Sequence, residues 1–90
     1  MYKIVYTKEA KKNITKLTNK KKGQIKEAIE NIASDPKTGN RLTQELSGLW
    51  SYRSGDYRII YQFSHKEILV IILTVGHRKE VYKKASRRTK

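Results

Sequence analysis

The first third of the chain has two hydrophobic patterns. Apolar and polar residues alternate at first, and apolar residues then recur at helical spacing. Residues 2–6 alternate with the period of a short strand. We expect Thr7 to cap a helix from Lys8 to about Leu17, because apolar residues recur there every three or four positions. A second apolar stripe predicts a helix from about Asn19 to Ser34, with a later start left open by the cost of a helical glycine at position 23. Asp35-Pro36 ends this helix, because the residue before a proline disfavours helical geometry.

The remaining pattern is typical of strands. Residues 37–45 are polar and predict a loop, with Leu42 and Leu46 as anchors onto the core. Residues 49–53 and 57–63 are β-rich runs joined by a tight turn at residues 54–56. The apolar run from Ile68 to Val75 predicts a central strand covered on both sides over most of its length, which Gly76 breaks.

This order, β-α-α-β-β-β, predicts an α+β fold. We expect a helical hairpin packed on a small, mostly antiparallel four-stranded sheet, followed by a C-terminal helical tail from residue 78. Ninety residues are enough for one domain, so residues 1–90 are interpreted as a single domain in which about 84–90 form a basic, frayed tail.

The charge narrows the classes of partner. The chain has 21 Lys and Arg against 8 Asp and Glu, a formal charge of +13, which attracts nucleic acid, an acidic protein or an anionic membrane. A membrane is the weakest of these, because no apolar run approaches the roughly 20 residues of a spanning helix. The N-terminus lacks the build of a signal peptide and cysteine is absent, so we expect a cytoplasmic protein. Without a glycine-rich phosphate loop or metal-ligand spacing, no metal or cofactor is expected.

A group of cationic and proton-exchanging residues gathers at the predicted strand ends: Arg53, Arg58, His77, Arg78 and Tyr82. Arginine matches phosphate oxygens and stays charged. RNA is cleaved without metal when its own 2′-OH attacks the neighbouring phosphorus, given cations and groups that move protons. We expect Arg58 and Arg78 to neutralise the phosphate, and His77 or Tyr82 to move protons or stack on a base. Lys79, Lys83 and Lys84 would add phosphate contacts, together with Arg53.

Plainer interpretations stay open for each residue. Arg58 is equally consistent with a surface residue that pairs with Asp56, and Arg53 is more consistent with a structural role. His77 is equally consistent with a helix cap, and Tyr82 with packing on the core. The aromatic residues of the strands, Trp50, Tyr52, Tyr57 and Tyr61, favour packing over base stacking, and the lysines at 20–22 indicate a solvated helix start.

Two segments carry a resemblance to a known family. Residues 46–61, LSGLWSYRSGDYRIIY, followed by residues 75–82, VGHRKEVY, resemble the RelE/ParE toxin superfamily of type II toxin–antitoxin modules. The predicted element order agrees with that family over nearly the whole chain. Among its branches the chain is most similar to RelE-type toxins, which are ribosome-dependent endoribonucleases that cut mRNA in the decoding site.

The resemblance implies specific roles and one departure. Arg58 and Arg78 match the arginines that bind phosphate and stabilise the transition state, and Tyr82 matches the C-terminal tyrosine. The lysines of the type member fall at Leu49 and Ser51 here, so their part in proton transfer does not carry over. His77 stands where that protein has a lysine and is a substitute for acid–base work.

The implied partners are an acidic antitoxin, the ribosome with its RNA and mRNA, and operator DNA only through the antitoxin. Two alternatives remain: a ParE-type inhibitor of DNA gyrase on the same fold, and a basic RNA-binding module without chemistry.

Overall fold

The computed structural model describes residues 1–77 and 80–81 of the chain. Five residues of the predicted site, Arg78, Lys79, Tyr82, Lys83 and Lys84, lie outside the described residues, as does all of the predicted tail except Glu80 and Val81. The elements follow in the order β1 (Lys3–Tyr6), α1 (Lys8–Thr15), α2 (Asn19–Ser34), β2 (Asn40–Arg41), β3 (Trp50–Ser54), β4 (Tyr57–Ser64) and β5 (Leu69–His77), with short 3₁₀ turns at Pro36–Thr38 and Gln44–Leu46.

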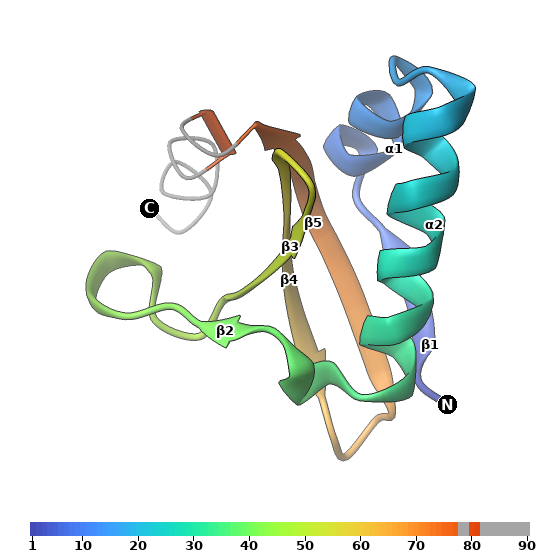
Figure 1. The fold of residues 1–90 in the computed structure, drawn as a ribbon. Coiled ribbons are helices and arrows are strands. Elements are labelled where there is room, and N and C mark those ends of the chain that lie inside the picture. Colours follow the sequence, from blue (N-terminus) through green and yellow to red (C-terminus); the bar gives the residue numbers. More distant parts are fainter. Residues whose placement is uncertain (78–79, 82–90) are drawn as a thin grey trace.

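The strands form one five-stranded sheet in the order β1-β5-β4-β3-β2. β1 runs parallel to β5, and the other neighbouring strands are antiparallel. In Figure 1 the two helices lie on one face of the sheet, and the chain between β2 and β3 lies on the other. The α+β class with a helical hairpin is confirmed, whereas the prediction of four strands is wrong by one.

The extra strand is β2, within the segment predicted to be a loop. Asn40 and Arg41 pair with Ser51 and Trp50 of β3. Gly39 permits this, because a Cβ at that position would lie 2.7 Å from the carbonyl oxygen of Ser51 and would also meet the Tyr61 hydroxyl. The polar composition of the segment hides a pairing that depends on the close approach of two backbones.

Both helices begin where threonine caps them. The Thr7 side chain accepts a hydrogen bond from the Ala10 amide, and the Thr18 side chain accepts one from the Lys21 amide. This second cap starts α2 at Asn19, so the alternative of a later start is wrong, and Gly23 is tolerated at an open position. The α2 helix ends before Pro36 as predicted, whereas α1 ends at Thr15 rather than Leu17.

The core has a large and a small part on opposite faces of the sheet. Under the helices, side chains of α1 and α2 pack on β4 and β5 in one cluster: Ala10, Ile25, Ala28, Ile29, Ile32, Ile59, Tyr61, Val70, Ile72 and Val75. On the outer face, Leu49, Ile60 and Val81 form a smaller cluster, with Leu42, Leu46 and Leu73 packed against it. Leu42 and Leu46 are therefore the anchors that the sequence predicts.

The outer face of β5 is only partly covered. Val70 and Ile72, which face the helices, are fully buried, whereas Leu69 and Ile71 are half-buried. Leu69 and Ile71 line an open hollow of about 260 Å³. The prediction of a strand covered on both sides over most of its length is therefore wrong for this half of β5, because the small outer cluster does not extend that far.

Candidate functional site

Arg53 and Arg58 stand directly opposite each other on the outer face of the sheet. They are register partners in β3 and β4, and Arg58 is the register partner of Gly76 in β5. Like charges in directly opposed positions repel, so this pair is unfavourable without a counterion. No side chain stands at position 76, and a Cβ there would lie 3.8 Å from the Val81 side chain, so Val81 packs on the strand beside Arg58. The two arginines therefore form a site suited to an anion.

The guanidinium of Arg58 is held at the end of the sheet. Its Nη1 donates a hydrogen bond to the carbonyl oxygen of Tyr57 at 3.4 Å, and the side chain is half-buried. The proposed alternative partner, Asp56, makes no ion pair with Arg58 among the residues that the structure describes. This arrangement favours a role in binding an external anion over a local surface salt bridge.

His77 lies on the other face of the sheet. The strand β5 does not stop at Gly76, as the sequence predicts, but continues to His77, which is the register partner of Tyr57. The two rings are stacked with their centroids 4.5 Å apart. Tyr57 packs against the core under the helices, so His77 and Arg58 point to opposite faces. The sequence groups them in one cluster, but the structure brings them together only at the rim of the sheet.

A bulge in β5 sets this arrangement. Ile60 pairs with Thr74 and Tyr61 with Ile72, so Leu73 is the extra residue. Without it, the register would bring Val75 opposite Arg58 and Gly76 opposite Tyr57. The bulge therefore places Gly76 on the outer face of the sheet and His77 on the face of the helices.

Two side chains of the α1 region satisfy the backbone of the bulge. The Thr7 hydroxyl donates to the Leu73 carbonyl oxygen at 2.7 Å. Asn13 Oδ1 accepts from the Val75 amide at 3.0 Å and from the Thr74 hydroxyl at 3.1 Å. Sequence reasoning missed Asn13, and its only signal was Thr74, the single polar residue in the apolar run.

The two positions at which the RelE type member carries lysines are buried here. Leu49 is 1% exposed and Ser51 is 3% exposed. Leu49 packs with Ile60 and Val81, so the chain after β5 covers this part of the outer face. A lysine at either position would bury its charge in a largely apolar contact, which is costly. The packing of this chain therefore disfavours a lysine at either position.

The sequence interpretation also missed the part played by Tyr57 and Lys21. It treated the tyrosine as packing and the lysine as part of a solvated helix start. In the structure, Lys21 Nζ lies 5.6 Å from the centre of the Tyr57 ring, within the range of a cation–π contact. The first turn of α2 thereby reaches the same end of the sheet as His77.

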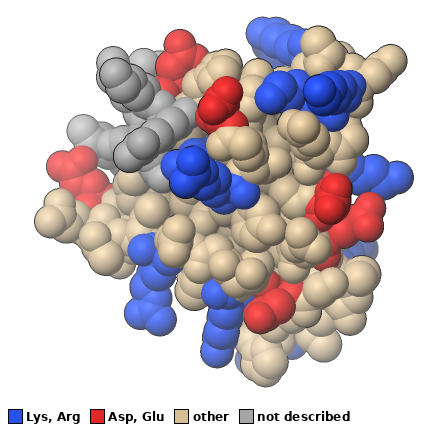
Figure 2. Space-filling model, in the orientation of Figure 1, with Lys and Arg blue, Asp and Glu red and all other residues tan. Residues whose placement is uncertain are grey.

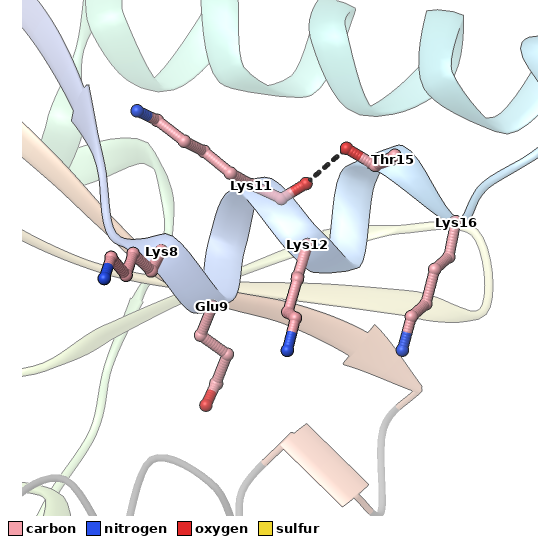
Figure 3. A pocket seen from close by; sticks show the side chains of 6 residues that line it. All are labelled: Lys8, Glu9, Lys11, Lys12, Thr15 and Lys16. Atoms are coloured by element: carbon pink, nitrogen blue, oxygen red, sulfur yellow. Dashed lines mark hydrogen bonds between the residues drawn. The ribbon is translucent and has the colours of Figure 1, made fainter.

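A basic hollow lies along α1. It measures about 680 Å³, is open to solvent, and is lined by Lys8, Glu9, Lys11, Lys12, Thr15 and Lys16. Figure 3 shows Lys12 and Lys16 pointing toward the end of β5, whereas Lys11 points toward α2. In Figure 2, lysine and arginine side chains gather at the top right, over the helical hairpin. This surface is suited to long-range attraction of a polyanion rather than to enclosing a small molecule.

Burial perturbs two tyrosines away from this site. Burial raises the pKa of Tyr61 to about 12, and its hydroxyl donates to the Pro36 carbonyl oxygen at 2.6 Å. Burial also raises the pKa of Tyr6. Both phenols are therefore poor proton acceptors at neutral pH, and Tyr61 has a structural part.

Neither a cluster of metal-ligating side chains nor a membrane-spanning helix is found among the described residues. Within residues 1–77 and 80–81, no three histidine, cysteine or acidic side chains are grouped so that they could hold a metal ion. The helices in that part of the chain are too short or too polar to cross a membrane.

Comparisons with known proteins agree on one family. A family model described as the ParE toxin of the type II toxin–antitoxin system parDE matches residues 4–82. Toxin RelG of Mycobacterium tuberculosis is 31% identical over 85 residues, which cover 92% of this chain and 98% of RelG.

Solved structures agree with this. The toxin–antitoxin complex RelBE2 of M. tuberculosis contains a chain that is 32% identical and has a TM-score of 0.79, with 86% of this chain and 91% of that chain covered. The isolated E. coli RelE toxin is 25% identical with a TM-score of 0.75, and both chains are covered completely.

Proposed function

Because the chain belongs to the ParE toxin family of type II toxin–antitoxin systems, we propose that this toxin is a ribosome-dependent endoribonuclease that cleaves mRNA in the cytoplasm. The 2′-oxygen attacks the neighbouring phosphorus and the bond to the 5′-oxygen breaks. The proton of the 2′-OH passes to a base, and the departing 5′-oxygen receives a proton. The products are a 2′,3′-cyclic phosphate and a 5′-hydroxyl end, and no metal takes part in the step.

The observation that carries the proposal is the pairing of Arg53 with Arg58 across β3 and β4. Two arginines in opposed register positions become favourable when they share a phosphate. The transition state gains negative charge on the phosphate oxygens, so the same cations stabilise it more than the substrate. Arg58 is therefore assigned to the scissile phosphate and Arg53 to phosphate binding.

The remaining catalytic roles rest on the resemblance to RelE-type toxins. Arg78 is assigned to the scissile phosphate with Arg58, and Tyr82 to proton transfer. Lys79, Lys83 and Lys84 are assigned to phosphate contacts. His77 points to the face of the sheet opposite Arg58, which favours a contact with the substrate base over proton transfer at the phosphate.

We assign three partners to the toxin. The complex RelBE2 of M. tuberculosis pairs a related toxin with its antitoxin, which supports an acidic antitoxin as the partner here. The formal charge of +13 and the lysines that point toward the end of β5 support docking on ribosomal RNA, with an affinity that falls steeply as salt rises. Operator DNA is contacted only through the antitoxin.

A second function, inhibition of DNA gyrase, is favoured by the match to a family model described as ParE. A gyrase inhibitor acts by binding and needs no cluster that cleaves RNA. The arginine pair and the relatives of the RelE type favour the nuclease over this alternative.

The experiment separates the two functions in one culture. Wild-type toxin, Arg58→Ala and the control Arg41→Ala are induced in a bacterium, and mRNA 5′ ends and plasmid supercoiling are measured together. Arg41 is an arginine of the same sheet that lies beside Trp50, away from the pair. We expect cuts within translated regions, lowered about 100- to 1,000-fold by Arg58→Ala and unchanged by Arg41→Ala.

Arg58→Ala should also leave the melting temperature unchanged or slightly raised, since it removes a like-charge contact. Growth arrest with intact mRNA and altered supercoiling would replace the nuclease with the gyrase inhibitor. Cleavage that persists in Arg58→Ala would remove Arg58 from the site.

A further inference from the structure

Three side chains from different elements meet at the end of the sheet on the helix side: Lys21 from α2, Tyr57 from β4 and His77 from β5. The rings of Tyr57 and His77 are tilted by 37° with centroids 4.5 Å apart. Lys21 Nζ lies 5.6 Å from the centre of the Tyr57 ring. Two stacked rings and an ammonium group therefore stand together at a strand end.

The exposure of these groups makes this more than an internal contact. His77 is exposed, and both Tyr57 and Lys21 are half-buried. A buried stack would have its ring faces covered by apolar neighbours, whereas the exposed imidazole leaves a ring surface accessible to a further planar group. Nucleobases are planar groups that stack on aromatic side chains, and a lysine beside such a stack commonly contacts the phosphate.

The site is adjacent to the arginine pair along the chain. Tyr57 and Arg58 are consecutive residues that point to opposite faces, and the Arg58 guanidinium bonds to the Tyr57 carbonyl oxygen. A strand of RNA that passes over the rim of the sheet would meet Arg58 on one side and the stacked rings on the other. Successive nucleotides are far enough apart to reach both.

We propose that Tyr57, His77 and Lys21 form a nucleotide-binding subsite, in which the base of a nucleotide next to the scissile phosphate stacks on His77 and its phosphate contacts Lys21. This inference rests on the proposed RNA cleavage and specifies where the substrate flanks are held. His77 thereby acts as a positioning residue for the substrate, supported from beneath by Tyr57, and transfers no proton.

The direct test uses an RNA that cannot be cleaved. The chain contains two histidines, His65 and His77, so ¹³C-labelled histidine gives two imidazole signals, which the His77→Phe variant assigns. The folded toxin is titrated with a 2′-O-methyl adenosine tetranucleotide. We expect the His77 signals to shift upfield from the ring current of a stacked adenine, and the His65 signals, from the turn after β4, to stay in place.

Variants separate stacking from charge and from acid–base chemistry. His77→Phe keeps a planar ring and should restore the binding of the tetranucleotide that His77→Ala loses. His77→Lys keeps a cation without a ring and should lose about tenfold in affinity, as should His77→Ala. Lys21→Ala should weaken binding and its salt dependence, whereas Lys20→Ala, an exposed lysine in the same turn, should change little. Thermal melts establish that each variant is folded.

The outcomes distinguish this subsite from the proposed activity. Binding of the tetranucleotide with unmoved His77 signals, no binding at all, or wild-type affinity in His77→Lys would overturn the subsite. Loss of cleavage in a folded His77→Phe would return His77 to proton transfer and would also overturn it. If the wild type binds the RNA through His77 but does not cut mRNA, the nuclease fails while the subsite stands.

Discussion

The sheet has a tyrosine–histidine pair at each end, and the two pairs differ in their surroundings. At one end Tyr57 and His77 stack with centroids 4.5 Å apart, beside Lys21 and Arg58. At the other end the rings of Tyr2 and His65 are 6.4 Å apart. There the Tyr2 hydroxyl and His65 Nδ1 are hydrogen-bonded at 2.8 Å, so the polar atoms of this pair bind each other.

The comparison teaches that the residue types alone do not identify a site. Tyr2 packs edge-on against Phe63, with ring centroids 6.2 Å apart, and belongs to the margin of the core. Both imidazoles are exposed, but the Tyr57–His77 pair has two cations beside it. The hydrogen bond satisfies the polar atoms of Tyr2 and His65 within the protein, whereas the stack of Tyr57 and His77 leaves a ring face available to a ligand.

The variant with the largest expected effect on the Tyr57–His77 pair is Asn13→Ala. It acts on the bulge in β5, which brings His77 opposite Tyr57. In Asn13→Ala the Val75 amide and the Thr74 hydroxyl lose their acceptor, and an unsatisfied buried group costs about 1–3 kcal/mol of folding free energy. We expect a lower urea midpoint and loss of the Tyr57–His77 stack, seen in the His77 imidazole signals.

Thr15→Ala is the matched control for this variant, because the Thr15 hydroxyl bonds to the Lys11 carbonyl oxygen on the exposed side of the same helix. It should leave both measurements nearly unchanged. An Asn13→Ala protein with unaltered stability and unaltered His77 signals would mean that the bulge holds its register without Asn13.

The bulge also marks the limit of what the sequence predicts. The two helices follow from apolar spacing and the cap of α1 from Thr7, and Tyr57 and Arg58 lie on opposite faces because they are consecutive residues of a strand. The face on which His77 lies depends on one extra residue in β5, and a change of one residue inverts a strand. Apolar periodicity carries no signal for Leu73, because every residue around it except Thr74 is apolar.

The candidate site divides in the same way. The predicted turn at residues 54–56 would pair Arg53 with Tyr57, whereas in the structure Ser54 pairs with Tyr57 and Arg53 with Arg58. The contact of Lys21 with Tyr57 joins residues 36 positions apart and depends on how α2 lies on the sheet. Local patterns therefore predict that the two arginines lie on neighbouring strands of one hairpin, but only the three-dimensional fold reveals their register and the stack with its lysine.

Tyr61 lies on the same strand as Tyr57 but is fully buried, so it shows how a tyrosine behaves when no ligand can reach it. In Tyr61→Phe the Pro36 carbonyl oxygen loses its donor, which should cost about 1 kcal/mol. Burial raises the pKa of Tyr61 from 10 to about 12, so the folded protein holds this proton more tightly than the unfolded chain.

The stability from that shift is complete below pH 10 and is lost as the pH rises toward 12. Urea unfolding at pH 9, 10 and 11 should therefore show a steeper decline for the wild type than for Tyr61→Phe. Equal slopes in the two proteins would contradict a raised pKa at Tyr61.

The smallest expected effect is at the far end of the sheet. Tyr2→Phe removes an exposed hydrogen bond and should cost about 0.5–1 kcal/mol in urea unfolding, because both groups can bond to water instead. The affinity for the 2′-O-methyl adenosine tetranucleotide should not change, since no cation–π contact or arginine pair is found beside Tyr2 among the described residues. If Tyr2→Phe lowers that affinity as much as His77→Ala does, the RNA contacts both ends of the sheet, and the exposed stack alone does not explain where it binds.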